Sequence, residues 1–124
     1  MAKRILIIDD EPLVLEMFAE ILSSESNQII TAPTAKTGMQ ALKSGNYDVV
    51  LIDVCLDEHD GFEIAKFARE RDANVRVILL SGQGDFAQSE MVKNGQAFFL
   101  SKPVSPRVLR DFVEFGEAKL KLAV

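Results

Sequence analysis

The sequence is poor in cysteine, in positive charge and in long apolar runs, and each shortage excludes a class of protein. Its single cysteine, Cys55, rules out an internal disulfide and a cysteine-rich zinc site, and it suits a reducing cytoplasm. Lys and Arg number 14 against 19 Asp and Glu, so the net charge of −5 argues against direct binding of nucleic acid or an anionic membrane. The apolar run at residues 5–8 is too short for a signal peptide or a membrane span. We therefore expect a cytoplasmic protein that does not associate with membranes.

The chain also has no internal repeat, no low-complexity tract, no linker and no Walker loop. What remains is the composition of an ordinary globular domain. Its 124 residues are 48% hydrophobic and 27% charged. A chain of this length can bury a hydrophobic core that is stable without disulfides or bound metal ions. We expect one domain that covers residues 1–124.

Short apolar runs alternate with stretches of helical periodicity along the whole chain. The runs, each typical of a strand, are residues 5–8, 29–30, 49–52, 75–80 and 97–100. Between them, apolar residues recur at helical spacing, as in the set Val14, Phe18, Ile21 and Leu22. Residues 85–94 show the weakest helical pattern. The last helix has the clearest start, because Ser105 is a good N-cap and a proline follows it.

Five strand–helix repeats predict an α/β domain with a five-stranded parallel sheet and helices on both faces. The run at residues 29–30 is the poorest and belongs at an edge of the sheet. We therefore expect the flavodoxin-like strand order 2-1-3-4-5.

Polar residues stand where these strands end. Asp9 and Asp10 follow the first strand, Asp53 the third, Ser81 the fourth and Lys102 the fifth. In such sheets the functional side chains lie at the carboxyl ends of the strands, beside the topological switch point between strands 1 and 3. Taken alone, two adjacent acids could be a solvated strand end or a helix N-terminal charge pair. Five polar residues at four strand ends instead indicate one site.

The residue types indicate phosphoryl chemistry. Carboxylates that lie close together repel, so one should shift toward protonation unless a cation joins them. Mg²⁺ is such a cation, because it prefers oxygen ligands. Lys102 adds a positive charge and Ser81 a hydroxyl donor, and both suit the oxygens of a phosphoryl group. An aspartate can itself act as the nucleophile and form an aspartyl phosphate.

In this order and spacing the five residues, with Pro103 after Lys102, resemble the receiver domain of bacterial two-component response regulators, as does the stretch "TGMQALKSGNYDVVLID". The likeness is to chemotaxis-regulator-like receivers and covers essentially the whole chain. It implies that Asp53 accepts a phosphoryl group from a histidine kinase or a phosphotransfer protein. It also implies that Asp10 binds Mg²⁺ directly, that Asp9 supports it, and that the backbone carbonyl of Cys55 is a further metal ligand.

The resemblance further implies a switch rather than a turnover enzyme. Ser81 and Phe99 would be the switch pair, Lys102 would contact the phosphoryl group, and a cis peptide bond would precede Pro103. The surface formed by the fourth helix, the fifth strand and the fifth helix would then bind a downstream output protein or domain, or a second copy in a homodimer. Gln83, two residues past Ser81, is either a group that positions the hydrolytic water or an ordinary loop residue.

Two alternatives remain open at this point. The chain could be the regulatory piece of a larger protein, such as a transcription factor, a cyclase or a hybrid kinase, since "EAKLKLAV" could lead into a further domain. It could also be a small flavin or nucleotide carrier, because "GQGDFA" at residues 82–87 fits a dinucleotide fingerprint. That fingerprint follows the fourth strand rather than the first, which counts against the second alternative. Cys55 is expected to be a small, half-buried residue.

Overall fold

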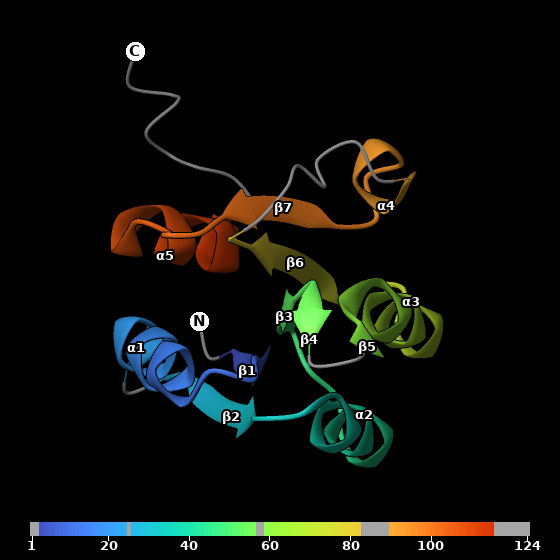
Figure 1. The fold of residues 1–124 in the computed structure, drawn as a ribbon, viewed down its shortest axis with the longest axis horizontal. Helices are drawn as coiled ribbons and strands as arrows, with labels where there is room; N and C mark the ends of the chain where they lie inside the picture. Colours follow the sequence, from blue (N-terminus) through green and yellow to red (C-terminus); the bar gives the residue numbers. More distant parts are fainter. Residues whose placement is uncertain (1–2, 25, 57–58, 83–89, 116–124) are drawn as a thin grey trace.

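A computed structural model describes residues 3–24, 26–56, 59–82 and 90–115. Its main sheet contains five parallel strands, which are β1 (Arg4–Ile8), β2 (Gln28–Ala32), β3 (Val49–Asp53), β6 (Arg76–Ser81) and β7 (Phe98–Ser101). The strand order is β2-β1-β3-β6-β7 (Figure 1), which is the predicted 2-1-3-4-5 order when the five main strands are counted along the chain. β2 lies at an edge, as its poor apolar run predicted.

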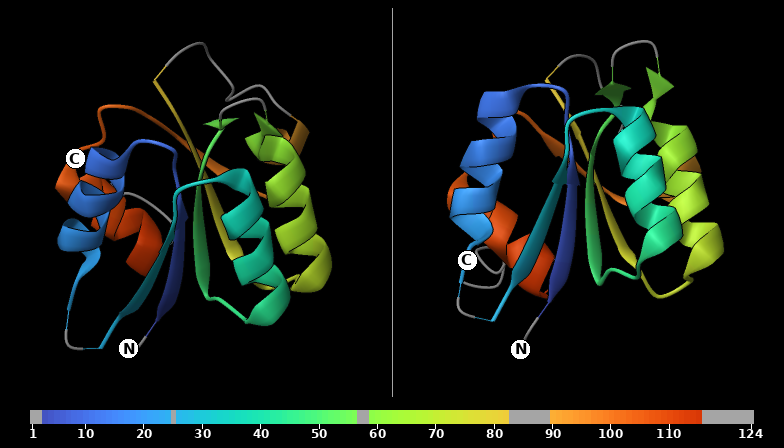
Figure 2. Two further views of the ribbon diagram at one scale, coloured as in Figure 1. Left: turned by 60° about the horizontal axis from the view of Figure 1, so that its bottom comes forward. Right: turned by 90° about the horizontal axis from the view of Figure 1, so that it is seen from below.

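Helices cover both faces of this sheet. They are α1 (Pro12–Leu22), α2 (Ala35–Ser44), α3 (Gly61–Arg71), α4 (Glu90–Lys93) and α5 (Pro106–Phe115). α1 and α5 lie on one face, and α2 and α3 lie on the other (Figures 1 and 2). The alternation of strand side chains explains the two layers, because Ile5 and Ile7 pack toward α1 and α5 while Leu6 and Ile8 pack toward α2 and α3.

The helix starts follow from local sequence. α2 begins with a capping box between Thr34 and Thr37, in which each side chain bonds the backbone N–H of the other residue. α5 begins at Pro106, and the hydroxyl of Ser105 accepts a long bond of 3.4 Å from the backbone N–H of Val108. No helix among the described residues is long and apolar enough to cross a membrane.

The structure differs from the sequence-based expectation in several places. β2 spans Gln28–Ala32 rather than residues 29–30, β1 begins one residue earlier than its apolar run, and β3 ends one residue later. β4 (Cys55–Leu56) and β5 (His59–Asp60) form a small antiparallel sheet that was not predicted. The last two main strands each begin and end one residue later than predicted, because their ladder continues to the pair Ser81 and Ser101. Of the weak helix predicted at residues 85–94, only α4 and Asn94 lie within the described part of the chain.

Candidate functional site

The candidate site lies at the carboxyl ends of β1, β3, β6 and β7. Asp9 directly follows β1, Asp53 is the last residue of β3, Ser81 is the last residue of β6, and Lys102 directly follows β7. β1 and β3 are neighbours in the sheet, although β2 lies between them in the sequence. This is the switch point at which parallel α/β sheets present their working groups.

Lys102 connects the carboxylates of the site. Its Nζ lies 2.8 Å from Oδ2 of Asp9, 3.5 Å from Oδ2 of Asp53 and 4.0 Å from Oε1 of Glu11. The shortest contact is a charge-assisted hydrogen bond from the ammonium to Asp9. One ammonium group therefore stands close to three carboxylates that come from two different strand ends.

Asp9 is fully buried, and both of its carboxylate oxygens are engaged. Oδ1 accepts a 3.0 Å hydrogen bond from the backbone N–H of Glu11, and Oδ2 accepts the bond from Lys102. A buried charge is tolerated when it is paired and hydrogen-bonded in this way. Asp9 thus fixes the turn into α1 and holds Lys102 at the mouth of the site.

Asp53 is buried as well, and its Oδ1 accepts a 3.1 Å hydrogen bond from the backbone N–H of Cys55. Burial raises the pKa of the Asp53 carboxyl above its usual value of 3.8, and the charges of Asp9 and Asp10 act in the same direction. The Cys55 N–H and the charge of Lys102 oppose this shift without cancelling it. Asp53 is therefore an acid whose ionised form would be stabilised by additional positive charge.

The pKa of the Lys102 ammonium is shifted in the direction that favours its charged form. Burial lowers the pKa of its ammonium, but the hydrogen bond to Asp9 and the charges of Asp9, Asp53 and Glu11 outweigh burial, so the net pKa is raised. Lys102 is therefore a permanent cation at neutral pH.

The site also has the donor set of a metal centre. Carboxylate oxygens of Asp9, Asp10, Glu11 and Asp53 all lie within 4.8 Å of one another. Four carboxylates face one ammonium group, which leaves an excess of negative charge. Hard oxygen donors with excess negative charge fit a hard divalent cation such as Mg²⁺. Because both carboxylate oxygens of Asp9 already accept hydrogen bonds, the acids that remain for a metal are Asp10, Glu11 and Asp53.

Comparison with known proteins identifies the family. A family model described as the response regulator receiver domain matches residues 5–114. The chain belongs to the response regulator receiver domain family. This assignment favours the receiver interpretation over the flavin or nucleotide carrier.

Relatives of this receiver domain include two transcriptional regulatory proteins. GlrR of Escherichia coli (strain K12) is 27% identical over 111 residues, which make up 89% of this chain and 25% of GlrR. SrrA of Staphylococcus aureus (strain NCTC 8325 / PS 47) is 31% identical over 108 residues, which make up 86% of this chain and 44% of SrrA. The receiver domain therefore matches less than half the length of either regulator.

Among solved structures, a CheY-like response regulator receiver domain protein from Methanospirillum hungatei JF-1 has the same fold as this receiver domain. The two chains superpose with a TM-score of 0.84 at 26% sequence identity, and the match covers 100% of both chains.

The remaining residues predicted for the receiver site lie on β6 and β7. Ser81 is buried at the end of β6, and its carbonyl accepts a 2.8 Å hydrogen bond from the backbone N–H of Lys102. Phe99 is partly buried and packs against the core layer of α2 and α3. The peptide bond between Lys102 and Pro103 is cis. Gln83 and most of the motif at residues 82–87 lie outside the described residues.

Two residues near the site were not predicted to have a role in the receiver domain. Glu11 directly follows Asp9 and Asp10 in the sequence, but its contact with Lys102 depends on how α1 turns away from β1. Gly61 begins α3 so close to β3 that a Cβ atom would clash with the carbonyl oxygen of Asp53 and lie 2.8 Å from Cα of Val54. The glycine after Asp60 was the only sequence signal for this packing.

The expectation for Cys55 was wrong. Cys55 is exposed rather than half-buried. It is the first residue of β4, and its partner in the pairing is Asp60 rather than a residue of the main sheet. Its backbone N–H nevertheless faces the receiver site through the bond to Asp53.

Proposed function

We propose that this receiver domain accepts a phosphoryl group on Asp53 in a Mg²⁺-dependent reaction. The donor would be a histidine kinase or a phosphotransfer protein. The observation that carries the proposal is the position of Asp53, a buried carboxylate that faces a lysine across an acidic cluster at the switch point of the sheet. Phosphoryl transfer needs mostly positioning and neutralised charge, and this arrangement offers both.

Asp10 and Asp53 are the acids best suited to hold the metal, with the backbone carbonyl of Cys55 as a further ligand. Asp9 supports these ligands in two ways. Its hydrogen bond from the backbone N–H of Glu11 fixes the turn that carries Asp10, and its hydrogen bond from Lys102 orients the ammonium group. When bound, Mg²⁺ supplies positive charge to the phosphoryl oxygens.

The reactive group is the Asp53 carboxylate. One of its oxygens forms a bond to phosphorus as the bond from phosphorus to the donor histidine nitrogen breaks, and the histidine leaves with that electron pair. The N–H of Cys55 holds one carboxylate oxygen, which fixes the orientation of the group. Lys102, already 3.5 Å from Asp53, gains a phosphoryl oxygen as a new partner.

The exposed face of α1 is the candidate contact for the phosphodonor protein. Leu13 is 78% exposed and Met17 is 48% exposed, and they lie four residues apart on one side of the helix. α1 begins three residues after Asp9. An apolar stripe at this distance suits a helical partner that must bring its phosphohistidine to Asp53.

The conformational change caused by phosphorylation would spread from Asp53 to β7 and the elements beside it. Ser81 donates to the new phosphoryl oxygens, and Phe99 changes its packing in response. The surface of α4, β7 and α5 would bind the output protein or domain, or a second copy of the chain. Hydrogen exchange with and without a phosphate mimic tests this route. Changes at β7 and α4 are expected, and changes confined to α1 would contradict it.

The domain would act as a cytoplasmic switch rather than a turnover enzyme, with no direct contact to nucleic acid or membrane. Residues 1–124 would form one receiver domain. The curated relatives are longer transcriptional regulators, which supports the alternative that this domain regulates an output domain in a larger protein.

Intact mass measurement with acetyl phosphate tests the proposed function. The wild-type protein should gain one phosphoryl group only when Mg²⁺ is present, and Asp53→Asn should gain none. Asp60→Asn is the matched control, because Asp60 caps α3 nearby without joining the acidic cluster. Equal labelling of Asp53→Asn and wild type would refute Asp53 as the acceptor.

A further inference from the structure

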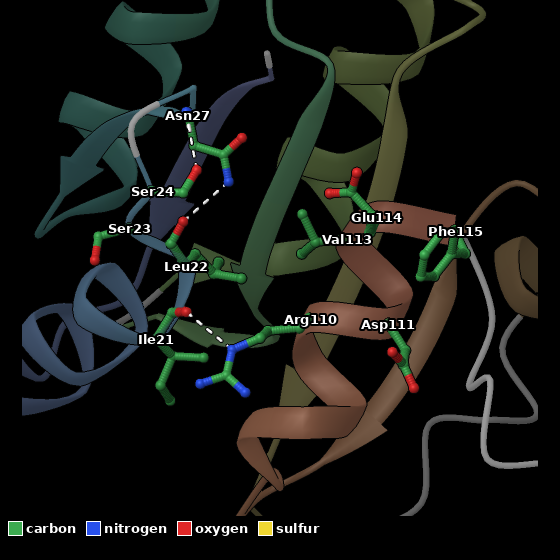
Figure 3. Close-up of a pocket in the computed structure, with 10 residues that line it drawn as sticks. All are labelled: Ile21, Leu22, Ser23, Ser24, Asn27, Arg110, Asp111, Val113, Glu114 and Phe115. Atoms are coloured by element: carbon green, nitrogen blue, oxygen red, sulfur yellow. Dashed lines mark hydrogen bonds between the residues drawn. The ribbon is translucent and has the colours of Figure 1, made fainter. Parts of the chain in front are cut away.

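A second surface feature lies at the far end of α1 from the acidic site. It is a groove of about 270 Å³ between the last turns of α1 and α5 (Figure 3). Leu22 and Val113 are both buried and form its apolar floor. The C-terminal position of these turns separates the groove from Asp9 and Asp10 by the whole length of α1.

The walls of the groove are held in place by side chains that bond the end of α1. Nε of Arg110 donates to the carbonyl of Ile21 at 3.3 Å, and Nδ2 of Asn27 donates to the carbonyl of Leu22 at 2.9 Å (Figure 3). These bonds satisfy carbonyls that a helix end leaves without partners. These hydrogen bonds therefore hold the residues on both sides of the groove in place.

The groove presents apolar surface beside acidic groups. Phe115 lines it and is 52% exposed, although large aromatic side chains are ordinarily covered. Asp111 and Glu114 also line it. An occupant that fits this chemistry carries apolar side chains and positive charge at close spacing.

We infer that the occupant is the segment of this same chain that follows α5, residues 116–124. Its sequence, "GEAKLKLAV", alternates Leu120, Leu122 and Val124 with Lys119 and Lys121. In an extended segment such alternation puts the apolar side chains on one face and the lysines on the other. The apolar face matches the groove floor, and the long lysine side chains of the outward face would reach the carboxylates of Asp111 and Glu114 at its rim.

The connection to Phe115 makes this occupant geometrically accessible. Phe115 lines the groove, so the segment starts at its edge. Nine extended residues reach up to roughly 30 Å, far enough to turn back and cross the groove. Gly116 directly follows α5, and glycine is the residue that most readily reverses the chain after a helix. The docked segment would fix the path by which the chain leaves the domain along the edge between α1 and α5.

Methyl NOE measurements on the full chain test this docking. Cross-peaks are expected from Leu120 or Leu122 to Leu22 and Val113. The double variant Leu120→Ser/Leu122→Ser should lose them and shift the groove resonances. Ala123→Ser is the matched control, because in the proposed extended segment residue 123 would share the face of the lysines, so the variant should leave the cross-peaks and the groove resonances unchanged.

Two outcomes would overturn the inference. If no cross-peak connects the segment to the groove, and the double variant shifts only resonances of residues 116–124, the groove does not bind this segment. If the cross-peaks appear only between differently labelled molecules and grow with protein concentration, the occupant is a second copy of the chain. Because the groove is remote from Asp53, loss of these contacts is distinguishable from loss of phosphorylation.

Discussion

Gly61 offers a sharp test of how the acceptor aspartate is positioned. Its backbone N–H donates to the carbonyl of Val54 at 2.9 Å, so the first turn of α3 rests directly on the end of β3. In Gly61→Ala the new Cβ would clash with the Asp53 carbonyl oxygen and lie 2.8 Å from Cα of Val54. Carbon atoms pack best at roughly 3.5 Å or more, so the contact with Val54 alone requires the backbone to move by at least roughly 0.7 Å.

This displacement should lower both stability and activity. Overpacking of this kind costs about 1–3 kcal/mol of unfolding free energy, and backbone cannot rotate away as a side-chain tip can. Because misplacement of a reacting group by about 1 Å can slow a reaction on the order of a hundredfold, we expect Mg²⁺-dependent labelling of Asp53 to slow by at least about tenfold. Urea denaturation measures the first effect, and the time course of mass gain with acetyl phosphate measures the second.

Gly45→Ala is the matched control. Its Cβ would meet Nη1 of Arg4 at 2.8 Å, but that atom is the tip of a flexible side chain. The φ of Gly45 is −158°, an extended conformation that alanine adopts readily. The control should be neutral or stabilised by about 0.4–1 kcal/mol, because alanine reduces the entropy of the unfolded chain. Wild-type stability and labelling rate in Gly61→Ala would refute the proposed contact between α3 and the acceptor strand.

Three further predictions concern charge and docking. Because burial raises the pKa of Asp53 in the folded protein, its ionisation costs stability as pH rises past the unfolded value of 3.8. At pH 7 without Mg²⁺, Asp53→Asn should therefore unfold at a higher urea concentration than wild type. This difference between the two urea midpoints should shrink as the pH falls toward 4, and a constant difference would contradict the prediction. Mg²⁺ at a hundred times its Kd should stabilise the wild-type fold by about 2.7 kcal/mol and raise its melting temperature accordingly. The melting temperature of Asp10→Asn should rise much less, and equal rises in the two proteins would show that Asp10 is not part of the metal site. Replacing Leu13 and Met17 by serine should slow phosphoryl transfer from a phosphodonor protein but leave labelling by acetyl phosphate unchanged, and equal slowing of both would count against α1 as the docking face.

Much of the fold could be predicted because its signals are local. The runs that form β1, β3 and β6 are continuous and apolar, since these strands are buried on both faces, and the alternation with helices left few possible topologies. The strand-end residues followed directly from this topology, so Asp9, Asp53 and Lys102 were expected near one another before any distance was known.

The features that were missed depend either on contacts between distant parts of the chain or on strands too short to leave a pattern. The bond between Lys102 and Asp9 joins residues 93 positions apart. Nothing in the local sequence tells which of several nearby carboxylates the ammonium selects. The β4–β5 hairpin has two residues in each strand, too few for a periodic signal. Exposure of Cys55 follows from that hairpin, so it was missed for the same reason.

Locating the phosphoryl group itself tests most directly whether Asp53 is the acceptor. The wild-type protein is labelled with acetyl phosphate and Mg²⁺, reduced with borohydride, digested and sequenced by tandem mass spectrometry. Borohydride converts an aspartyl phosphate to homoserine, so we expect homoserine at position 53 and unmodified aspartate at positions 9, 10 and 60. Homoserine at any of those three positions, with Asp53 intact, would contradict it.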